Sequence, residues 1–314
     1  MPRARFRLGL VLALGLAGLS SWSAATVSAV DGRGTQVHLP LPASRVVGLT
    51  PHAVEMLYAI GAGGNLVGRV EYADWPKAAQ SLPSVGSYSG LSLEAVLALR
   101  PQLVVVWGSG TSPRDVARLR QLGIPLFVSE PRTLPAVAAE MEALGVLTGH
   151  AASARAAATQ YRNRLARLAA DNVGKRRLRV FWQLNETPLM TASGQQFMSH
   201  LLTLCGGDNV FAALSGLTPM VSTEAVLAAR PEVMLAQGGM ASLAHWRRWP
   251  SLPAVRHQTL YAVPADETSR PGPRLVEGAE AVCRVLDAAR QGGVGGGSPS
   301  TGQLRVFLAR RECH

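Results

Sequence analysis

The chain contains one segment twice. Residues 94–108 (EAVLALRPQLVVVWG) return 130 positions later as residues 224–238 (EAVLAARPEVMLAQG). Each copy reads as a short helix, a proline break, an apolar strand and a glycine turn. A repeat with so wide a spacing predicts two similar α/β lobes, each with its own sheet, rather than a stack of small repeats. Two lobes joined once would form a cleft, where small ligands commonly bind.

The N-terminal segment has the features of a secretory signal peptide. Three arginines within residues 3–7 precede an apolar run at residues 8–19, and residues 27–29 (VSA) match a small-residue cleavage site. The apolar run is short for a membrane-spanning helix, which needs roughly 20 residues. We therefore predict that residues 1–29 are removed, that the mature chain starts near Val30, and that the protein is exported.

The net charge suggests a nucleic-acid partner at first sight. It is +11 over the 314 residues, but the predicted signal peptide contributes three of these charges and residues 291–314 contribute two. The densest basic run, residues 175–179 (KRRLR), has no aromatic residue within it. Such a run is typical of a solvated helix end before a strand, so we expect no nucleic-acid partner.

The mature chain divides into an N-terminal lobe, a linking helix, a C-terminal lobe and a tail. Strand-like runs alternate with helical segments, which predicts βα units and mostly parallel sheets. The strands of the first lobe are expected at residues 45–49, 66–70, 103–107 and 126–128, and those of the second at 178–184, at the repeated strand and at 260–263. The four parts span residues 30–148, 149–172, 173–290 and 291–314, of which the last is Gly/Ser-rich and expected to be disordered.

No catalytic motif stands out along the chain. There is no G-x-S-x-G, no Walker A sequence and no H-E-x-x-H pair among the seven scattered histidines. His52 follows a strand end and could ligate a metal or a haem, but a surface or capping role is commoner for such a residue. We therefore predict a protein that is not an enzyme and that holds no metal ion of its own.

Aromatic residues gather where ligands bind in open α/β sheets, at or after the carboxyl ends of strands. The four residues in such positions are Tyr72, Trp75, Tyr88 and Trp107. They predict a flat, partly apolar ligand. The alternative is that one or two of them close the core of the lobe.

Two acids occupy matching places in the repeat. Ser92 and Ser222 are expected helix N-caps, which places Glu94 and Glu224 in first helical turns. These acids could simply stabilise the helix dipoles, or they could mark two equivalent docking points for a basic partner.

The three cysteines are expected in an oxidising compartment. Cys205 and Cys283 both fall in the second lobe and are predicted to form a disulfide, which leaves Cys313 free in the tail. The alternative is three reduced thiols.

Five segments carry a resemblance to a known family: LTP at 49–51, YADWP at 72–76, VGSYSGLSLE at 85–94, RPQLV at 100–104 with Trp107, and LCGGDNVF at 204–211. Together they resemble the periplasmic cobalamin-binding proteins, within the class of iron-chelate, haem and cobalamin substrate-binding proteins of ABC importers. The likeness extends from about Arg45 to Ala289.

The resemblance implies two α/β lobes bridged by one long helix, a ligand in the cleft between them, and no catalysis. It implies that cobalamin or a related corrinoid is the transported ligand rather than a cofactor. One lobe-two position departs from the family pattern, because Thr218 stands where a tryptophan is expected. The implied ligand contacts are Tyr72, Tyr88, Trp107, Met190, Asp266 and Arg270.

The resemblance also assigns partners. Glu94 and Glu224 match acids that dock onto arginines of an ABC permease, which works with an ATPase, and Cys205 and Cys283 match a family disulfide. The chain itself is expected to be a monomer. A haem or ferric-siderophore binder of the same fold is the alternative, and an enzyme or metal chaperone on a bilobal scaffold is the rival from another class.

Overall fold

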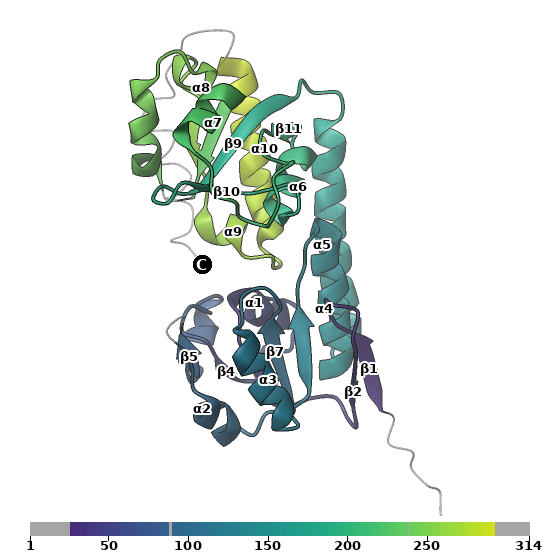
Figure 1. The fold of residues 1–314 in the computed structure, drawn as a ribbon. Helices are drawn as coiled ribbons and strands as arrows, with labels where there is room; N and C mark the ends of the chain where they lie inside the picture. Colours follow the sequence, from purple (N-terminus) through teal and green to yellow (C-terminus); the bar gives the residue numbers. More distant parts are fainter. Residues whose placement is uncertain (1–25, 88–89, 238, 293–314) are drawn as a thin grey trace, which may run out of the picture.

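The computed structural model describes residues 26–87, 90–237 and 239–292. These residues form two α/β lobes, one above the other in Figure 1, with the long helix α5 (Ala151–Asn172) along one side of both. The predicted fold class, two lobes with mostly parallel sheets, is confirmed. Predicted calls on Tyr88, on Cys313 and on the first 25 residues lie outside the described residues.

Lobe one is built on a four-stranded parallel sheet in the order β4-β3-β7-β8. All four strands were expected from the sequence, and they are β3 (Val46–Gly48), β4 (Leu66–Arg69), β7 (Leu103–Trp107) and β8 (Leu126–Ser129). The lobe also contains α1 (Pro51–Ala59), α2 (Leu93–Ala98), α3 (Pro113–Gln121), α4 (Leu134–Thr148), the 3-10 helices η1 (Gly63–Asn65) and η2 (Lys77–Ser81), and the small pair β5 (Gly86–Ser87) and β6 (Gly90–Leu91).

Lobe two has a sheet in the order β10-β9-β12-β13, and β11 also pairs with β9. Only β10 is antiparallel to its neighbour. The strands are β9 (Leu178–Asn185), β10 (Met190–Thr191), β11 (Gly207–Asn209), β12 (Val233–Ala236) and β13 (Leu260–Ala262). Its helices are α6 (Phe197–Leu204), α7 (Thr223–Ala229), α8 (Pro253–Arg256), α9 (Ala265–Ser269), α10 (Leu275–Gly292) and η3 (Met240–Arg248). The sequence did not predict β10 and β11, because two or three residues are too few to show a period.

The repeated segment folds the same way in both lobes. Ser92 and Ser222 cap α2 and α7. Each serine hydroxyl oxygen accepts a hydrogen bond from the backbone N–H of the residue three positions later, at 3.2 Å for Ser92 and 3.1 Å for Ser222. Each helix is followed by an arginine in the left-handed region, Arg100 at φ 45° and Arg230 at φ 46°. An arginine seldom adopts this conformation. Its recurrence at both positions shows that the two copies share one helix-ending turn.

The predicted start of the mature chain, near Val30, falls within an N-terminal strand of the structure. Strand β1 (Val27–Val30) pairs antiparallel with β2 (Gln36–Leu39), whose Val37 and Leu39 are buried. A cleavage after residue 29 would remove most of β1 and expose this apolar surface. The pairing of β1 favours a start before Val27, and the position of the cleavage stays a prediction.

Helix α5 joins the two lobes through a shared core. It packs along α4 in lobe one and against α10 and α6 in lobe two. The buried apolar side chains along these helices belong to one continuous cluster that reaches from β3 to α10. A continuous core of this kind resists large rotations of one lobe against the other. Among the described residues, no helix is both long and apolar enough to cross a membrane.

Candidate ligand-binding site

The carboxyl ends of the two sheets face each other across the lobe boundary. Residues that follow β13 in lobe two reach α1 in lobe one, which begins where β3 ends. A Cβ atom on Gly272 would lie only 3.3 Å from the Cβ of His52, so the two backbones approach closely here. Figure 1 draws α9 and β10 on the edge of lobe two that faces α1. This edge is where ligands bind in open α/β sheets.

Ion pairs hold the two lobes together at this boundary. Glu55 of α1 has a side chain that is only 2% exposed. It accepts hydrogen bonds from Arg274 at 2.7 and 3.0 Å and from Arg270 at 3.2 Å, both of which come from lobe two. A buried carboxylate without partners would be costly. The two arginines therefore fix Glu55 and, through it, the relative position of the lobes.

The predicted ligand contacts Asp266 and Arg270 belong to the same ion-pair cluster. Arg270 lies 3.1 Å from Asp266 and donates to Asp74 at 2.8 Å. Although burial acts to raise the pKa of Asp74, the hydrogen bond and charge of Arg270 lower it below its usual value. Arg274, which the sequence analysis did not single out, stacks 4.8 Å from the ring centre of Trp75. Glu55, an acid within the apolar α1 segment, is a sequence signal that could have indicated its side of the cluster.

The predicted aromatic contacts of lobe one lie at this boundary with parts of their rings accessible. Tyr72 is 39% exposed and Trp75 is 42% exposed, and both belong to the loop that contributes Asp74. Trp107 is half-buried at the last position of β7 and meets the ring of His52 edge to face at 5.6 Å. The loop and the strand end therefore bring large aromatic surfaces to the edge that faces lobe two.

A surface or capping role was expected for His52 from the sequence. That expectation was wrong, because the residue is only 1% exposed. Its Nδ1 lies 2.7 Å from the hydroxyl of Thr50, and its Nε2 lies 2.9 Å from that of Ser129. Since Ser129 donates to Glu140 at 2.5 Å, His52 donates through Nε2 and accepts at Nδ1. Both ring nitrogens are thus occupied, and the residue has no nitrogen left for a haem iron.

Burial dominates the titration of this buried network. It lowers the pKa of His52 to about 3, with a further contribution from the positive charge of Arg270. Burial also raises the pKa of Glu140 to about 7, although the hydrogen bonds from Ser129 and the Glu130 backbone act to lower it. The network therefore keeps the imidazole neutral beneath Trp107.

Lobe two brings methionines to the same edge. Met190 is half-buried and pairs with Asn185, the last residue of β9. It also bridges to Met220, which is 71% exposed and which the sequence analysis did not single out. Thr218, in the position of the missing tryptophan, is exposed.

The two predicted docking acids occupy equivalent positions. Glu94 and Glu224 are exposed in the first turns of α2 and α7. Hydrogen bonds from its own backbone and from Ser222 lower the pKa of Glu224, which keeps this carboxylate charged. Each lobe thus presents one of the two predicted docking acids on its surface. The predicted disulfide Cys205–Cys283 is present, with an S–S distance of 2.03 Å.

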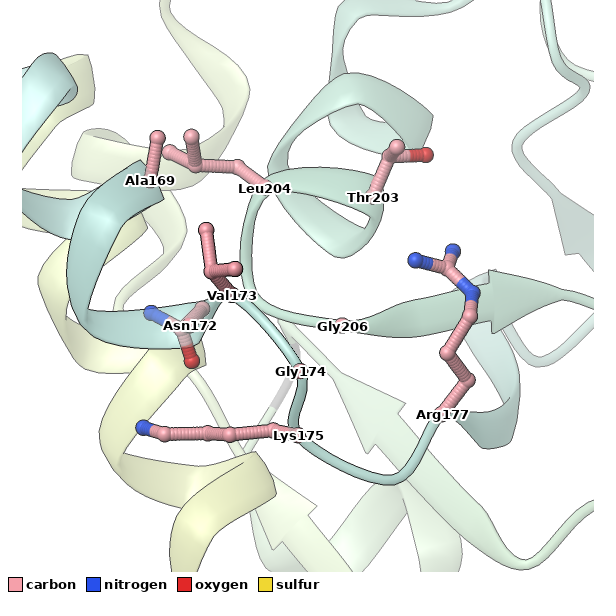
Figure 2. Close-up of a pocket in the computed structure, with 9 residues that line it drawn as sticks. All are labelled: Ala169, Asn172, Val173, Gly174, Lys175, Arg177, Thr203, Leu204 and Gly206. Atoms are coloured by element: carbon pink, nitrogen blue, oxygen red, sulfur yellow. The ribbon is translucent and has the colours of Figure 1, made fainter.

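A surface pocket of about 420 Å³ lies elsewhere, between the end of α5 and α6 (Figure 2). It opens beside the start of β9, at the opposite end of the sheet from Met190. Two of its lining residues are basic, but Lys175 pairs with Asp287 at 2.9 Å and Arg177 with Asp208 at 2.7 Å. Together with the Arg176–Glu232 pair at 2.6 Å, these contacts neutralise most of the basic run. The described residues contain no group of three or more His, Cys, Asp or Glu side chains arranged to hold a metal ion.

The comparisons with known proteins agree with this geometry. The sequence profile of the family described as Periplasmic binding protein matches residues 46–267. The chain is a member of this periplasmic binding protein family. Membership confirms the prediction of a binding protein rather than an enzyme.

Relatives within the family differ in their ligands. A "Vitamin B12-binding protein" of Vibrio cholerae is 36% identical over 80% of this chain and 92% of its own length. The crystal structure of the periplasmic vitamin B12-binding protein BtuF of Vibrio cholerae superposes with a TM-score of 0.75, at 36% identity over 80% of this chain and 99% of that one. The structure of the periplasmic haem-binding protein RhuT from Roseiflexus superposes with a TM-score of 0.68, at 25% identity over 78% of this chain and 98% of that one.

Proposed function

We propose that this protein captures cobalamin or a related corrinoid in the periplasm and delivers it to the permease of an ABC importer, which works with an ATPase. The observation that carries the proposal is the 36% identity to the Vibrio cholerae vitamin B12-binding protein over 92% of that protein. The match extends over 254 residues and 80% of this chain, so both lobes contribute to it.

The chemistry of the facing edges supports a corrinoid. A corrin is broad, with apolar faces and a polar amide rim. The aromatic surfaces of Tyr72 and Trp107 suit the faces, and the Asp266–Arg270 pair suits the rim. Met190 supplies an apolar contact from lobe two. Tyr88, the remaining proposed contact, lies outside the described residues.

A haem ligand is the weaker candidate. Haem iron needs an axial ligand such as His or Tyr. His52 uses both ring nitrogens within the buried network, so it has no nitrogen left to serve as that ligand. Identity to the haem-binding RhuT is 25%, against 36% for the vitamin B12-binding protein at similar coverage.

Export by a cleavable signal peptide is part of the proposal. Since β1 pairs with β2 from Val27 onward, we place the cleavage before this strand rather than after residue 29. Intact mass measurement of the exported protein should give a mature chain that retains residues 27–29. A mass that corresponds to a start at Val30 would contradict this placement.

Isothermal titration of the exported protein with cyanocobalamin tests the ligand, with cobinamide and haemin titrated in parallel. The proposal predicts one-to-one binding of cyanocobalamin that is at least tenfold tighter than binding of haemin. The cobinamide titration shows whether the lower base contributes. A tight haemin complex without corrinoid binding would replace the proposal with haem uptake.

A further inference from the structure

The turn between β1 and β2 carries an arginine to the carboxyl end of the lobe-one sheet. The N–H of Gly32 donates to Val128 O at 2.8 Å, which attaches this turn to the last part of β8. Nη2 of Arg33 donates to the backbone oxygen of Gly108. Gly108 directly follows Trp107, the last residue of β7. The guanidinium therefore lies at the strand end that carries an aromatic contact of the proposed ligand site.

Gly108 makes room for this arginine. A Cβ atom at Gly108 would lie 2.9 Å from Nε of Arg33 and closer still to Oε2 of Glu130, so a larger residue would displace one of them. The Arg33 side chain is nevertheless 53% exposed. A guanidinium has five N–H groups, and among the described residues this one donates a single hydrogen bond. Its remaining donors can therefore bind a ligand.

A second arginine approaches the same acid. Arg132, in the segment between β8 and α4, has a side chain that is 57% exposed. Its Nε lies 3.8 Å from one Glu130 oxygen, and Nη2 of Arg33 lies 3.7 Å from the other. Both separations exceed the length of a hydrogen bond, and Oε2 of Glu130 has no hydrogen-bond partner within the described residues. The acid thus keeps both guanidinium groups nearby but holds neither of them tightly.

The acids of this region are buried, whereas the two arginines are exposed. Asp31, Glu130 and Glu140 are 6%, 8% and 5% exposed. Asp31 accepts three backbone N–H groups at 2.8–3.3 Å. Glu140 accepts the hydroxyl of Ser129 at 2.5 Å and the N–H of Glu130 at 2.9 Å. The charge that faces solvent at this strand end is therefore positive.

We propose that Arg33 and Arg132 form an anion subsite for the phosphodiester of a complete corrinoid, in which a phosphate joins the lower base to the ring. This inference rests on the proposed function. The planar fork of a guanidinium matches two phosphate oxygens, and two such groups can bind one phosphate together. The phosphodiester lies at the margin of the corrin. A ring stacked on Trp107 can therefore present it to the arginines beside Gly108.

The subsite would set the preference among corrinoids. An aromatic surface such as that of Trp107 can contact the ring of any corrinoid. Cobinamide has the same ring but lacks the phosphodiester and the lower base. The two arginines add a contact that only a complete corrinoid makes, so they favour it over cobinamide.

The subsite is tested by titrating cyanocobalamin and dicyanocobinamide into wild-type protein, Arg33→Gln, Arg132→Gln and the double variant. The double variant should raise the Kd of cyanocobalamin about tenfold, because charge-assisted hydrogen bonds to the phosphate are lost. Its Kd for dicyanocobinamide should equal that of the wild type. Arg118→Gln is the matched control, because Arg118 is exposed in the last turn of α3, and it should change neither Kd. Thermal unfolding identifies any variant that has lost its fold.

Ionic strength provides a second test, which needs no variant. Salt screens the attraction between exposed arginines and a phosphate. For wild-type protein, the Kd of dicyanocobinamide divided by that of cyanocobalamin should fall severalfold as NaCl is raised from about 0.05 M to about 0.5 M. In the double variant this ratio should stay constant. A wild-type ratio that does not respond to salt would refute the subsite.

The outcomes separate the inference from the proposed function. If the folded double variant binds cyanocobalamin like the wild type, or loses affinity equally for both corrinoids, the anion subsite is wrong and the corrinoid function stands. If wild-type protein binds neither corrinoid, the proposed function fails and the inference fails with it.

Discussion

The two lobes share a scaffold and differ at the edges that face each other. Away from the site they match closely: Arg45 donates to Leu99 O at 2.6 Å at the end of α2, and Arg179 donates to Ala229 O at 2.6 Å at the end of α7. At the facing edges lobe one presents aromatic rings over a titratable network, whereas lobe two presents arginines and methionines. The repeated parts hold the sheets and the exposed acids, and the differing parts would discriminate between ligands.

The strongest test of the shared scaffold is the pair of acids. Glu94→Ala combined with Glu224→Ala should abolish uptake of cobalamin by cells, because both proposed docking points for a basic permease surface are lost. Affinity for cobalamin in titration should be unchanged, since neither exposed acid lies at the facing edges. Each single variant should reduce uptake to a similar degree. Unchanged uptake in the double variant would remove the docking role.

The ion pairs between the lobes provide the next largest effect. Arg274→Ala removes the principal partner of buried Glu55 and should lower the free energy of unfolding by about 3–5 kcal/mol. Arg162→Ala is the matched control, because Arg162 pairs with Glu142 at 2.6 Å on an exposed surface, where the loss should be below about 1 kcal/mol. Chemical denaturation measures both. Equal losses in the two variants would mean that the lobes are not held by this cluster.

The buried networks of the lobes should differ in their response to pH. In lobe two the buried Gln183 accepts from the indole of Trp246 at 2.8 Å, and neither group titrates. In lobe one, Glu140 has its pKa raised from 4.5 to about 7, so the folded state binds the extra proton between these values. Stability from this residue therefore falls as the pH rises from 4.5 to 7, by about 3 kcal/mol in all.

The substitution Glu140→Gln removes the pH dependence of stability that comes from this carboxylate. Comparing it with wild type therefore separates the contribution of Glu140 from that of His52. The lowered pKa of His52 acts in the opposite direction, because its contribution is lost as the pH falls below 6.5. The unfolding free energy of Glu140→Gln relative to wild type should rise steadily between pH 4.5 and 7. Glu142→Gln, at an exposed site on the same helix, should show little such change. A flat difference for Glu140→Gln would mean that the carboxylate ionises normally.

The smallest expected effect on stability comes from removing either of the two capping serines. Ser92→Ala and Ser222→Ala each remove one hydrogen bond at a helix start and should each cost about 1 kcal/mol. Their effects on the free energy of unfolding should be equal, because the burial pattern of the two helices is nearly the same. A difference larger than the cost itself would show that the two copies of the repeat are not equivalent in energy.

Local signals in the sequence predicted most of the scaffold. The four strands of lobe one, the capping serines and the disulfide all followed from periodicity, turn residues and composition. Local signals could not predict contacts between residues that are distant in the sequence. Glu55 and Arg274 are 219 positions apart, and nothing near either residue indicates the other. The burial of His52 was missed for the same reason, because Ser129 closes the network from 77 positions away.

The candidate site was predictable where it depends on strand ends and less so where it depends on pairing. Tyr72 and Trp107 could be placed because Tyr72 follows a recognisable strand and Trp107 ends one. Met220 could not, because its position comes from a bridge to Met190 within a two-residue strand that shows no period. The same limit applied at the N-terminus, where the sequence did not predict the pairing of β1 with β2.

A crystal structure of the exported protein with cyanocobalamin tests the central claim most directly. The account predicts the corrin between the carboxyl ends of the two sheets, with one face against Trp107 and the other against Met190 and Met220. Cobalamin bound in the pocket between α5 and α6, or on the outer surface of one lobe, would contradict it.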